Sequence, residues 1–512
     1  MSRRAESFLQ NITVDGVYDW TKCAGQQYFL QQAKEYGCES FVAFSNSPVV
    51  LYTKNGQGYS GSSSTANIQS TKYGNFADYM TTVVKHFMDE GYNFNYISPV
   101  NEPQWEWNKN EQEGSPWTNA EIKTLVTALD NSIASKGLTN TKILIPEAGQ
   151  WDYTYGQSGK KAGNQIYEFF DSNSSNYVGD LSSVAPVIAG HSYWKDKTNG
   201  NIRSVRQQVK TKAGQYNLGV FQTEWSMMED SGIDGLPANY DYIDVAINMA
   251  KIIHSDMAYA NAASWSFWTS MDMERWSQKN RFNLVRVRPG NSDYPTTYSQ
   301  LETAGAVTAE PTLWALGNYS LFIRPGYQRI QLTGADDLAG LMGTAYLAPD
   351  HSKIVAVYVN MANTDNTIIL SVNNPDATLL SVNKYVTSAN SNLKKDNQPI
   401  DVAGNQIVSI PKRSVTTLVY TYDSGTSLFR IADTHQVSVY PNPVKAGEAL
   451  LFSMDSLGDY QASLYTLNGQ LISNQTNDAN GGITIPEQLP KGTYLLAITG
   501  NQFSIQRKIV VF

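Results

Sequence analysis

Two glutamates, Glu102 and Glu224, carry the clearest chemical signal in this chain of 512 residues. Glu102 stands in an Asn-Glu-Pro motif after the run 94–97, and Glu224 ends the apolar run 219–223 just before Trp225. Each carboxylate therefore ends an expected buried strand, which is where a barrel enzyme presents its catalytic groups. Two carboxylates held across one sugar ring can hydrolyse a glycosidic bond. The alternative is that both are solvated surface charges, as most acids are.

The two glutamates require a scaffold, and the first three hundred residues alternate between strand-like and helix-like patterns. Short apolar runs predict six strands at 40–44, 96–100, 142–146, 187–190, 218–223 and 262–267. Helical patterns lie between them at 76–90, 119–134 and 242–254. We expect Asn119 to cap the second helix, because its side-chain oxygen can accept a free N–H of the first turn. Repeated strand–helix units of this kind predict an α/β fold with a (β/α)8 barrel.

Six strands are two fewer than a closed barrel of this type has. The missing pair would leave long edges at the strands 40–44 and 262–267, which proteins avoid. The simplest interpretation is that the sequence begins inside the barrel and lacks strands 1 and 2. We therefore expect a gap between these two edge strands.

Composition divides the chain into further domains. The barrel is expected to occupy residues 1–320, and strands with turns predict an antiparallel β-sandwich side domain at 321–425. A polar stretch predicts a linker at 426–436, and residues 437–512 form a third, small β module.

Charge and composition narrow the partners of the chain. The net charge is −8 without a basic block, which argues against nucleic acid and against an anionic membrane surface. No run of eighteen apolar residues exists, so no membrane-spanning segment is expected. Aromatic residues reach 12%, and Tyr and Trp rings suit sugar binding, although an aromatic core explains part of this count.

The two cysteines, Cys23 and Cys38, are expected to be free thiols. The segment 24–36 between them reads as a helix, which would separate its ends by roughly 20 Å. That separation exceeds the reach of a disulfide. The five histidines are scattered and no Cys/His spacing fits zinc, so we expect no metal and no cofactor.

An ordered set of short motifs resembles glycoside hydrolase family 30, in the branch of the endo-β-1,6-galactanases, over residues 3 to about 425. Asn-Glu-Pro alone is shared by many barrel glycosidases, whereas the whole set is much more specific. The matching runs are 3–9 (RRAESFL), 18–20 (YDW), 44–48 (FSNSP), 98–105 (SPVNEPQW), 112–114 (QEG), 145–149 (IPEAG), 190–194 (GHSYW) and 223–226 (TEWS).

The resemblance implies roles for the two glutamates in a retaining reaction. Glu102 corresponds to the acid/base after strand 4 of the family, and Glu224 to the nucleophile after strand 7. The strand at 40–44 would then be strand 3. Glu147 also ends a strand, and we interpret it as a rim or structural residue.

Further residues are candidates for substrate binding. Asn101 is suited to hold the sugar 2-hydroxyl, with a strand-end cap as its alternative role. Tyr193 could donate to the nucleophile, and His191 lies two residues earlier on the same side of a strand, although a lone His is usually structural. The remaining candidates are aromatic or amide side chains around the same pocket: Asn46, Trp105 and Trp268, with Trp107 and Trp194 for flanking subsites.

The last 75 or so residues resemble the C-terminal sorting domain of type IX secretion in Gram-negative bacteria. The resemblance rests on Pro-Asn-Pro at 441–443, Gly-Thr-Tyr at 492–494 and a basic-apolar end at 507–512. It implies a secreted or cell-surface protein that contacts the secretion machinery through residues 437–512. The alternative is an ordinary accessory β-sandwich.

The resulting hypothesis is a retaining endo-β-1,6-galactanase that acts on arabinogalactan-type polysaccharides or oligosaccharides. Activity on β-1,6-glucan or xylan remains open within the same family, because residue spacing does not distinguish galactose from glucose. A non-catalytic carbohydrate-binding protein also remains open, because the barrel is incomplete. The oligomeric state is not predicted.

Overall fold

A computed structural model covers all 512 residues. It describes the chain except for residues 1–5, 12, 62–63, 160, 274–278, 293–294, 296, 371–377, 399, 401, 403–405, 424–437, 454–459, 467–470, 477–481 and 501–503. The linker expected at 426–436 therefore lies outside the described residues.

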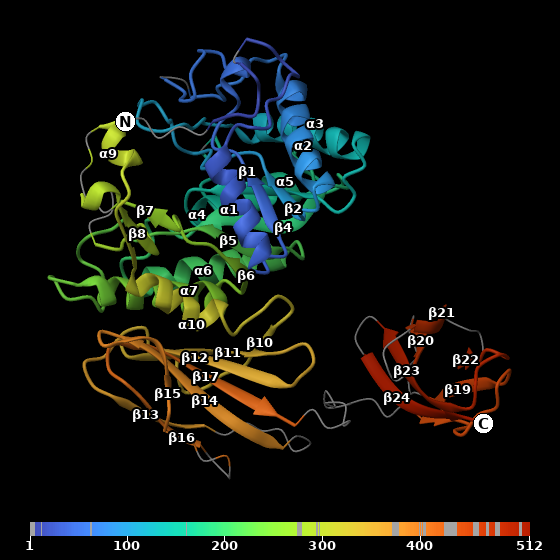
Figure 1. The fold of residues 1–512 in the computed structure, drawn as a ribbon. Coiled ribbons are helices and arrows are strands. Elements are labelled where there is room, and N and C mark those ends of the chain that lie inside the picture. The colour runs from blue at the N-terminus through green and yellow to red at the C-terminus, as the bar shows by residue number, and fades with distance from the viewer. Residues whose placement is uncertain are drawn as a thin grey trace. The chain divides into compact units, whose positions relative to one another are not determined.

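The first part of the chain forms a six-stranded parallel sheet, which confirms the α/β class and all six expected strands (Figure 1). The strands pair in chain order, so that sequential strands are neighbours throughout. They are β1 (Phe41–Phe44), β2 (Phe94–Ser98), β3 (Lys142–Ala148), β4 (Val184–His191), β5 (Gly219–Glu224) and β6 (Ala262–Trp265).

Helices connect these strands, as crossovers between parallel strands require. Three expected helices are present as α2, α3 and α7, but Asn119 is not the cap of α3. Thr118 caps it instead, because its hydroxyl accepts from Glu121 N–H and the Glu121 carboxylate accepts from Thr118 N–H in return. The helices are α1 (Ala24–Glu35), α2 (Tyr73–Asp89), α3 (Asn119–Ser135), α4 (Asp152–Tyr155), α5 (Gln165–Phe170), α6 (Asn199–Gly214), α7 (Tyr242–Tyr259), α9 (Tyr298–Glu302) and α10 (Pro311–Ser320), with short 3-10 turns η1 (Val50–Tyr52) and η2 (Pro289–Asn291).

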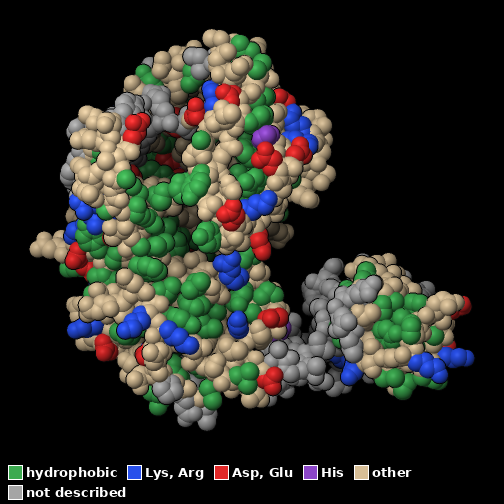
Figure 2. Space-filling model, in the orientation of Figure 1, with side chains coloured by type: hydrophobic (Ala, Val, Ile, Leu, Met, Phe, Trp, Pro, Cys, Tyr) green, Lys and Arg blue, Asp and Glu red, His purple; other side chains and the backbone are tan. Residues whose placement is uncertain are grey.

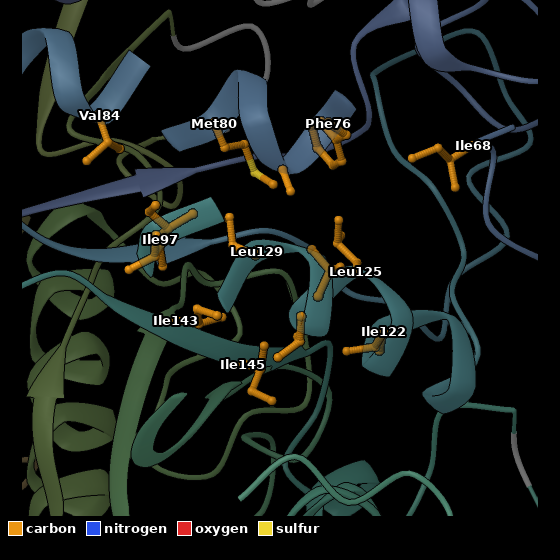
Figure 3. Close-up of a cluster of buried hydrophobic side chains, with 14 of the residues drawn as sticks. Ile68, Phe76, Met80, Val84, Ile97, Ile122, Leu125, Leu129, Ile143 and Ile145 are labelled. Carbon is orange, nitrogen blue, oxygen red and sulfur yellow. The ribbon is translucent and has the colours of Figure 1, made fainter. Parts of the chain in front are cut away.

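One face of the sheet packs on α2 and α3 through a continuous apolar core. Buried side chains recur along both helices every three or four residues, which is the spacing that keeps them on one helix face. Figure 3 shows side chains of α2, α3, β2, β3 and the chain before α2 gathered in this core: Ile68, Phe76, Met80, Val84, Ile97, Ile122, Leu125, Leu129, Ile143 and Ile145. This core therefore packs on the strand that leads to Glu102 and on the strand that contains Glu147.

The sheet is open, because in the described chain β1 pairs only with β2, and β6 only with β5. The expected gap between these edge strands is therefore present. On β1, Val42 and Phe44 are 47% and 44% exposed, whereas Phe41 and Ala43 pack on the core. Hydrophobic side chains also gather on the front of this part of the molecule (Figure 2). Cys23 and Cys38 are free, as expected.

Antiparallel sheets follow the parallel one. A small sheet contains β7 (Met271–Asp272), β8 (Val285–Arg288) and β9 (Ala306–Ala309). A six-stranded sheet in the order β10-β11-β12-β17-β14-β15 and a two-stranded sheet of β13 and β16 come next. Their strands are β10 (Gln328–Ile330), β11 (Leu341–Leu347), β12 (Lys353–Asn360), β13 (Asn366–Leu370), β14 (Leu379–Ser388), β15 (Ser391–Asp396), β16 (Gln406–Ile410) and β17 (Ser414–Tyr422).

The C-terminal residues belong to a separate compact unit with its own apolar core. It contains two antiparallel sheets, in the orders β18-β19-β22 and β21-β20-β23-β24. Their strands are β18 (Ser438–Tyr440), β19 (Ala449–Ser453), β20 (Tyr460–Tyr465), β21 (Leu471–Thr476), β22 (Gly482–Thr484), β23 (Gly492–Gly500) and β24 (Ser504–Val511). The Asn442 side chain pairs with the backbone of β24 at Lys508 and Val510, which ties the motif 441–443 to the last strand.

Candidate active site

The two glutamates expected to act together converge at the carboxyl ends of the parallel strands. Glu224 is the last residue of β5, and Glu102 follows β2. A carboxylate oxygen of Glu102, one of Glu224 and a ring nitrogen of His191 all lie within 4.8 Å of one another. His191 ends β4, between the strands that carry the glutamates.

These carboxylates border a cavity of about 500 Å³. Its wall combines tryptophan rings with amide and carboxylate groups, the composition expected of a site that stacks on and hydrogen-bonds to a sugar. The lining residues are Asn46, Asn101, Glu102, Trp105, Trp107, Gln112, Glu113, Tyr193, Trp194, Glu224, Met228 and Trp268.

The structure brings nearly all of the predicted site residues to this cavity. Asn46, Asn101, Trp105, Tyr193 and Trp268 line it together with both glutamates. The Oδ1 atom of Asn101 is buried without a partner in the described part of the chain, so it is available to a substrate hydroxyl. His191 is the exception, since it is completely buried and lies behind the lining rather than in it.

The loop after Glu102 forms one wall of the cavity. The indole N–H of Trp107 donates to the backbone carbonyl oxygen of Glu102 at 3.2 Å, so this ring is held next to the candidate acid/base. A side chain at Gly114 would meet the Trp107 ring at 2.4 Å, so only glycine permits this packing. The lining also includes Gln112, Glu113 and Met228, which were not predicted from the sequence. The run 112–114 matches a family motif, but its residue types indicated no role.

Of the two roles expected for Glu147, rim or structural, the first is wrong, because Glu147 is 2% exposed and does not lie on the rim. Its carboxylate accepts from Ser98 Oγ at 2.7 Å and lies 3.3 Å from His191 Nε2, so it contacts the site from beneath.

Hydrogen bonds orient Glu224. The Tyr193 hydroxyl donates to Glu224 Oε1 at 3.0 Å. Burial raises the pKa of Glu224 to about 7; the charge of His191 and the Tyr193 hydroxyl oppose this rise, and the charges of Glu102 and Glu147 add to it. Glu224 therefore gains or loses its proton near neutral pH.

Glu102, His191 and Glu224 are the one group in the described chain whose spacing could hold a metal ion. Both ring nitrogens of His191 already face carboxylates, Nδ1 at 2.9 Å from Glu102 and Nε2 at 3.3 Å from Glu147. Burial opposes a charge on His191, but the surrounding Glu224, Glu102 and Glu147 carboxylates prevail and raise its pKa well above the usual range. We interpret these residues as an acid–base cluster.

Comparison with known proteins is decisive for the family. Residues 1–280, more than half of the chain, match the family model described as O-Glycosyl hydrolase family 30. The chain belongs to this family. It is therefore a glycoside hydrolase.

Relatives within and near this family differ in their activities. An endo-beta-1,6-galactanase from Hypocrea rufa is 24% identical over 262 residues, which are 51% of this chain and 47% of that protein. This chain thus spans about half the length of that relative. The glucuronoxylanase XynC of Bacillus subtilis is 21% identical over 399 residues, 76% of this chain and 75% of that protein. A conserved exported protein from Bacteroides fragilis has a similar fold, with a TM-score of 0.71, 28% identity and coverage of 81% and 82%.

The C-terminal unit also has known relatives. Residues 438–512 match the family model of a secretion system C-terminal sorting domain. The protein is accordingly secreted or displayed on the surface of a Gram-negative bacterium. Among the described residues, no helix combines the length and apolarity needed to cross a bilayer.

Proposed function

We propose that this glycoside hydrolase is a retaining endo-β-1,6-galactanase acting on arabinogalactan-type polysaccharides, with Glu224 as nucleophile and Glu102 as acid/base. The observation that carries the proposal is the convergence of the two carboxylates, within 4.8 Å, at an aromatic cavity. Retaining glycosidases hold their carboxyl groups roughly 5–5.5 Å apart, whereas inverting enzymes separate them by roughly 6.5–9.5 Å to admit a water.

In the first step, ionised Glu224 attacks the anomeric carbon of the bound sugar, and protonated Glu102 gives its proton to the departing glycosidic oxygen. The Tyr193 hydroxyl orients the attacking carboxylate. The amide of Asn101, with its unpartnered oxygen, is placed to hold the sugar 2-hydroxyl. Such a contact strengthens in the transition state.

In the second step, water replaces the Glu224 ester. Glu102 is now ionised and takes a proton from the attacking water, which restores both carboxyl groups. The anomeric carbon is inverted twice, so the product keeps the β configuration of the substrate.

The charge of the cavity supports a neutral substrate. Its described lining includes the carboxylates Glu102, Glu113 and Glu224 but no Lys or Arg. A glucuronate substituent would meet like charges there without a cationic partner. This favours β-1,6-galactan, with β-1,6-glucan as the second candidate, over glucuronoxylan.

Initial rates on a panel of polysaccharides test this assignment. We expect β-1,6-galactan to be cleaved to a mixture of oligosaccharides early in the reaction, as internal cleavage produces, with β-1,6-glucan slower and glucuronoxylan uncleaved. NMR of the first reducing end released should show the β anomer. Faster cleavage of glucuronoxylan would contradict the substrate, an α anomer would contradict retention, and binding without turnover would leave only a carbohydrate-binding protein.

The pH dependence of kcat/KM should reflect Glu224. Its pKa is about 7 and it attacks only when ionised, so activity should fall about tenfold per pH unit below that value. Tyr193→Phe removes a hydrogen bond that favours the ionised form of Glu224. The pH below which kcat/KM falls, the acid limb of the profile, should therefore rise by roughly one unit. Tyr216→Phe is the matched control, because its hydroxyl donates to Asp171 away from the cavity. An unmoved limb in Tyr193→Phe would assign the limb to another group.

We also propose the division of the chain expected from its sequence. Residues 1–320 would be the catalytic domain, related to (β/α)8 barrels, followed by a β-sandwich side domain at 321–425, a linker at 426–436 and the sorting domain at 437–512. The separate apolar cores of the two compact units support the last boundary.

Deletion of residues 437–512 should leave kcat on polysaccharide within about twofold of the full chain, because every residue of the cavity lies before 270. Delivery to the cell surface should be lost, since these residues match a sorting domain. Activity of purified protein and of washed cells measures the two effects separately. A large fall in kcat of the purified truncated enzyme would show that the module takes part in catalysis.

A further inference from the structure

Glu147 is a buried carboxylate directly beneath the proposed active site, with no place in the two steps above. It is the penultimate residue of β3 and is 2% exposed, and it is not among the residues that line the cavity. Three side chains from three other strands or strand ends surround it: Ser98 of β2, His191 of β4 and Thr223 of β5. A carboxyl group that three side chains contact is not a solvated rim residue, which was one of the two roles expected from its position in the sequence.

The partners of Glu147 all meet it as a hydrogen-bond acceptor. The hydroxyls of Ser98 and Thr223 both donate to the Glu147 carboxylate. A carboxylate can only accept, so His191 Nε2, at 3.3 Å, carries a proton and donates it.

The other ring nitrogen of His191 faces the proposed acid/base. Its Nδ1 lies 2.9 Å from Glu102 Oε1 and 3.9 Å from Glu224 Oε1. The imidazole is completely buried and therefore exchanges no hydrogen bond with solvent. A single ring thus joins Glu147 to Glu102.

The backbone provides a second, independent link. Glu102 and Glu147 have φ angles of 41° and 52°, in the left-handed region that residues other than glycine seldom adopt. The Glu102 N–H donates to the Glu147 carbonyl oxygen at 2.9 Å. Backbone strain of this kind persists where the surroundings impose it, often at functional sites.

We propose that Glu147 is a positioning residue for this reaction: through His191 it holds a positive charge and a fixed N–H beside Glu102. The inference rests on the proposed roles of Glu102 and Glu224. Glu147 acts through His191 and does not touch the substrate.

Counting protons through the first step shows how the positive charge of His191 acts on Glu102. When Glu102 gives its proton to the leaving group, it becomes an anion while Glu224 becomes a neutral ester. If His191 stays protonated throughout, the four groups Glu102, Glu147, His191 and Glu224 carry a net charge of −1 before and after this step. The imidazolium thereby stabilises ionised Glu102 at the moment when it must act as a base.

Glu147→Gln tests the proposal, because it removes the charge and keeps the shape. An imidazolium without this anion loses its proton at lower pH, so the pH at which His191 loses its second ring proton should move down by roughly 1–3 units. The facing groups Glu102, Glu224 and Tyr193 remain in place. Thr223→Val removes one hydrogen-bond donor to Glu147 and should keep the fold. It should lower kcat less than Glu147→Gln does.

Glu168→Gln is the matched control, because it makes the same change on α5, where Glu168 contacts Ser174 and Asn176. Nitrogen-15 NMR of His191 gives a readout independent of turnover: the wild type should show two protonated ring nitrogens at pH 7, and Glu147→Gln should lose one. A His191 spectrum that titrates as in the wild type would overturn the proposal, even if activity fell. Full activity of Glu102 and Glu224 variants would instead overturn the proposed catalytic pair, without altering the predicted His191 spectra.

Discussion

Replacing Glu224 by alanine is expected to lower hydrolysis of β-1,6-galactan on the order of 10⁶-fold, the scale seen when a covalent nucleophile is removed. The variant should fold normally, since the Glu224 side chain lies at a strand end and its hydrogen-bond partner is the Tyr193 hydroxyl at the cavity. Initial rates on polysaccharide and circular dichroism of the purified variant measure the two expectations.

Azide distinguishes loss of the nucleophile from general damage. A small anion can enter the space left by the Glu224 side chain and attack the anomeric carbon of an activated aryl β-galactoside, which gives the α-galactosyl azide. Glu224→Gln fills that space and should not be rescued, so it serves as the matched control. Unimpaired hydrolysis by Glu224→Ala would remove Glu224 from the mechanism.

The strands of the parallel sheet could be predicted because each one is marked by its own short stretch of sequence. Parallel strands covered by helices are apolar along their whole length, so each appears as a short uninterrupted run. Since such strands end at one edge of a sheet, the residues after the runs were expected to meet, and Glu102, His191 and Glu224 do meet. The open edges at β1 and β6 followed from the strand count.

Other features depend on contacts that no local pattern reveals. The burial of Glu147 results from Ser98, His191 and Thr223, which are 49, 44 and 76 positions away along the chain. The cavity wall at Gln112 and Glu113 belongs to a loop, whose path is set by the packing of Trp107 on Gly114. The cap of α3, in contrast, was predicted one residue too late although a local pattern marks it: Thr118 followed three residues later by Glu121 is a capping box.

Replacing Glu102 by alanine should have an effect that depends on the leaving group. A general acid contributes roughly 10²–10⁴-fold when the departing group is a poor one, as a sugar hydroxyl is. Hydrolysis of β-1,6-galactan should therefore fall by about that factor. A dinitrophenyl β-galactoside needs no proton to depart, so the glycosyl-enzyme should still form and then accumulate, because no base activates water. Stopped-flow release of dinitrophenol should show a burst followed by a slow steady rate.

Azide should again restore turnover of this variant, but with the opposite product. It needs no base and attacks the α-linked ester on Glu224, so the product is the β-galactosyl azide, whereas Glu224→Ala gives the α anomer. The two variants thus assign the two glutamates by stereochemistry, independently of how far either rate falls. An exchange of the two anomers would reverse the assignment of Glu102 and Glu224, and equal losses on galactan and on the dinitrophenyl substrate would show that Glu102 does not act as the acid.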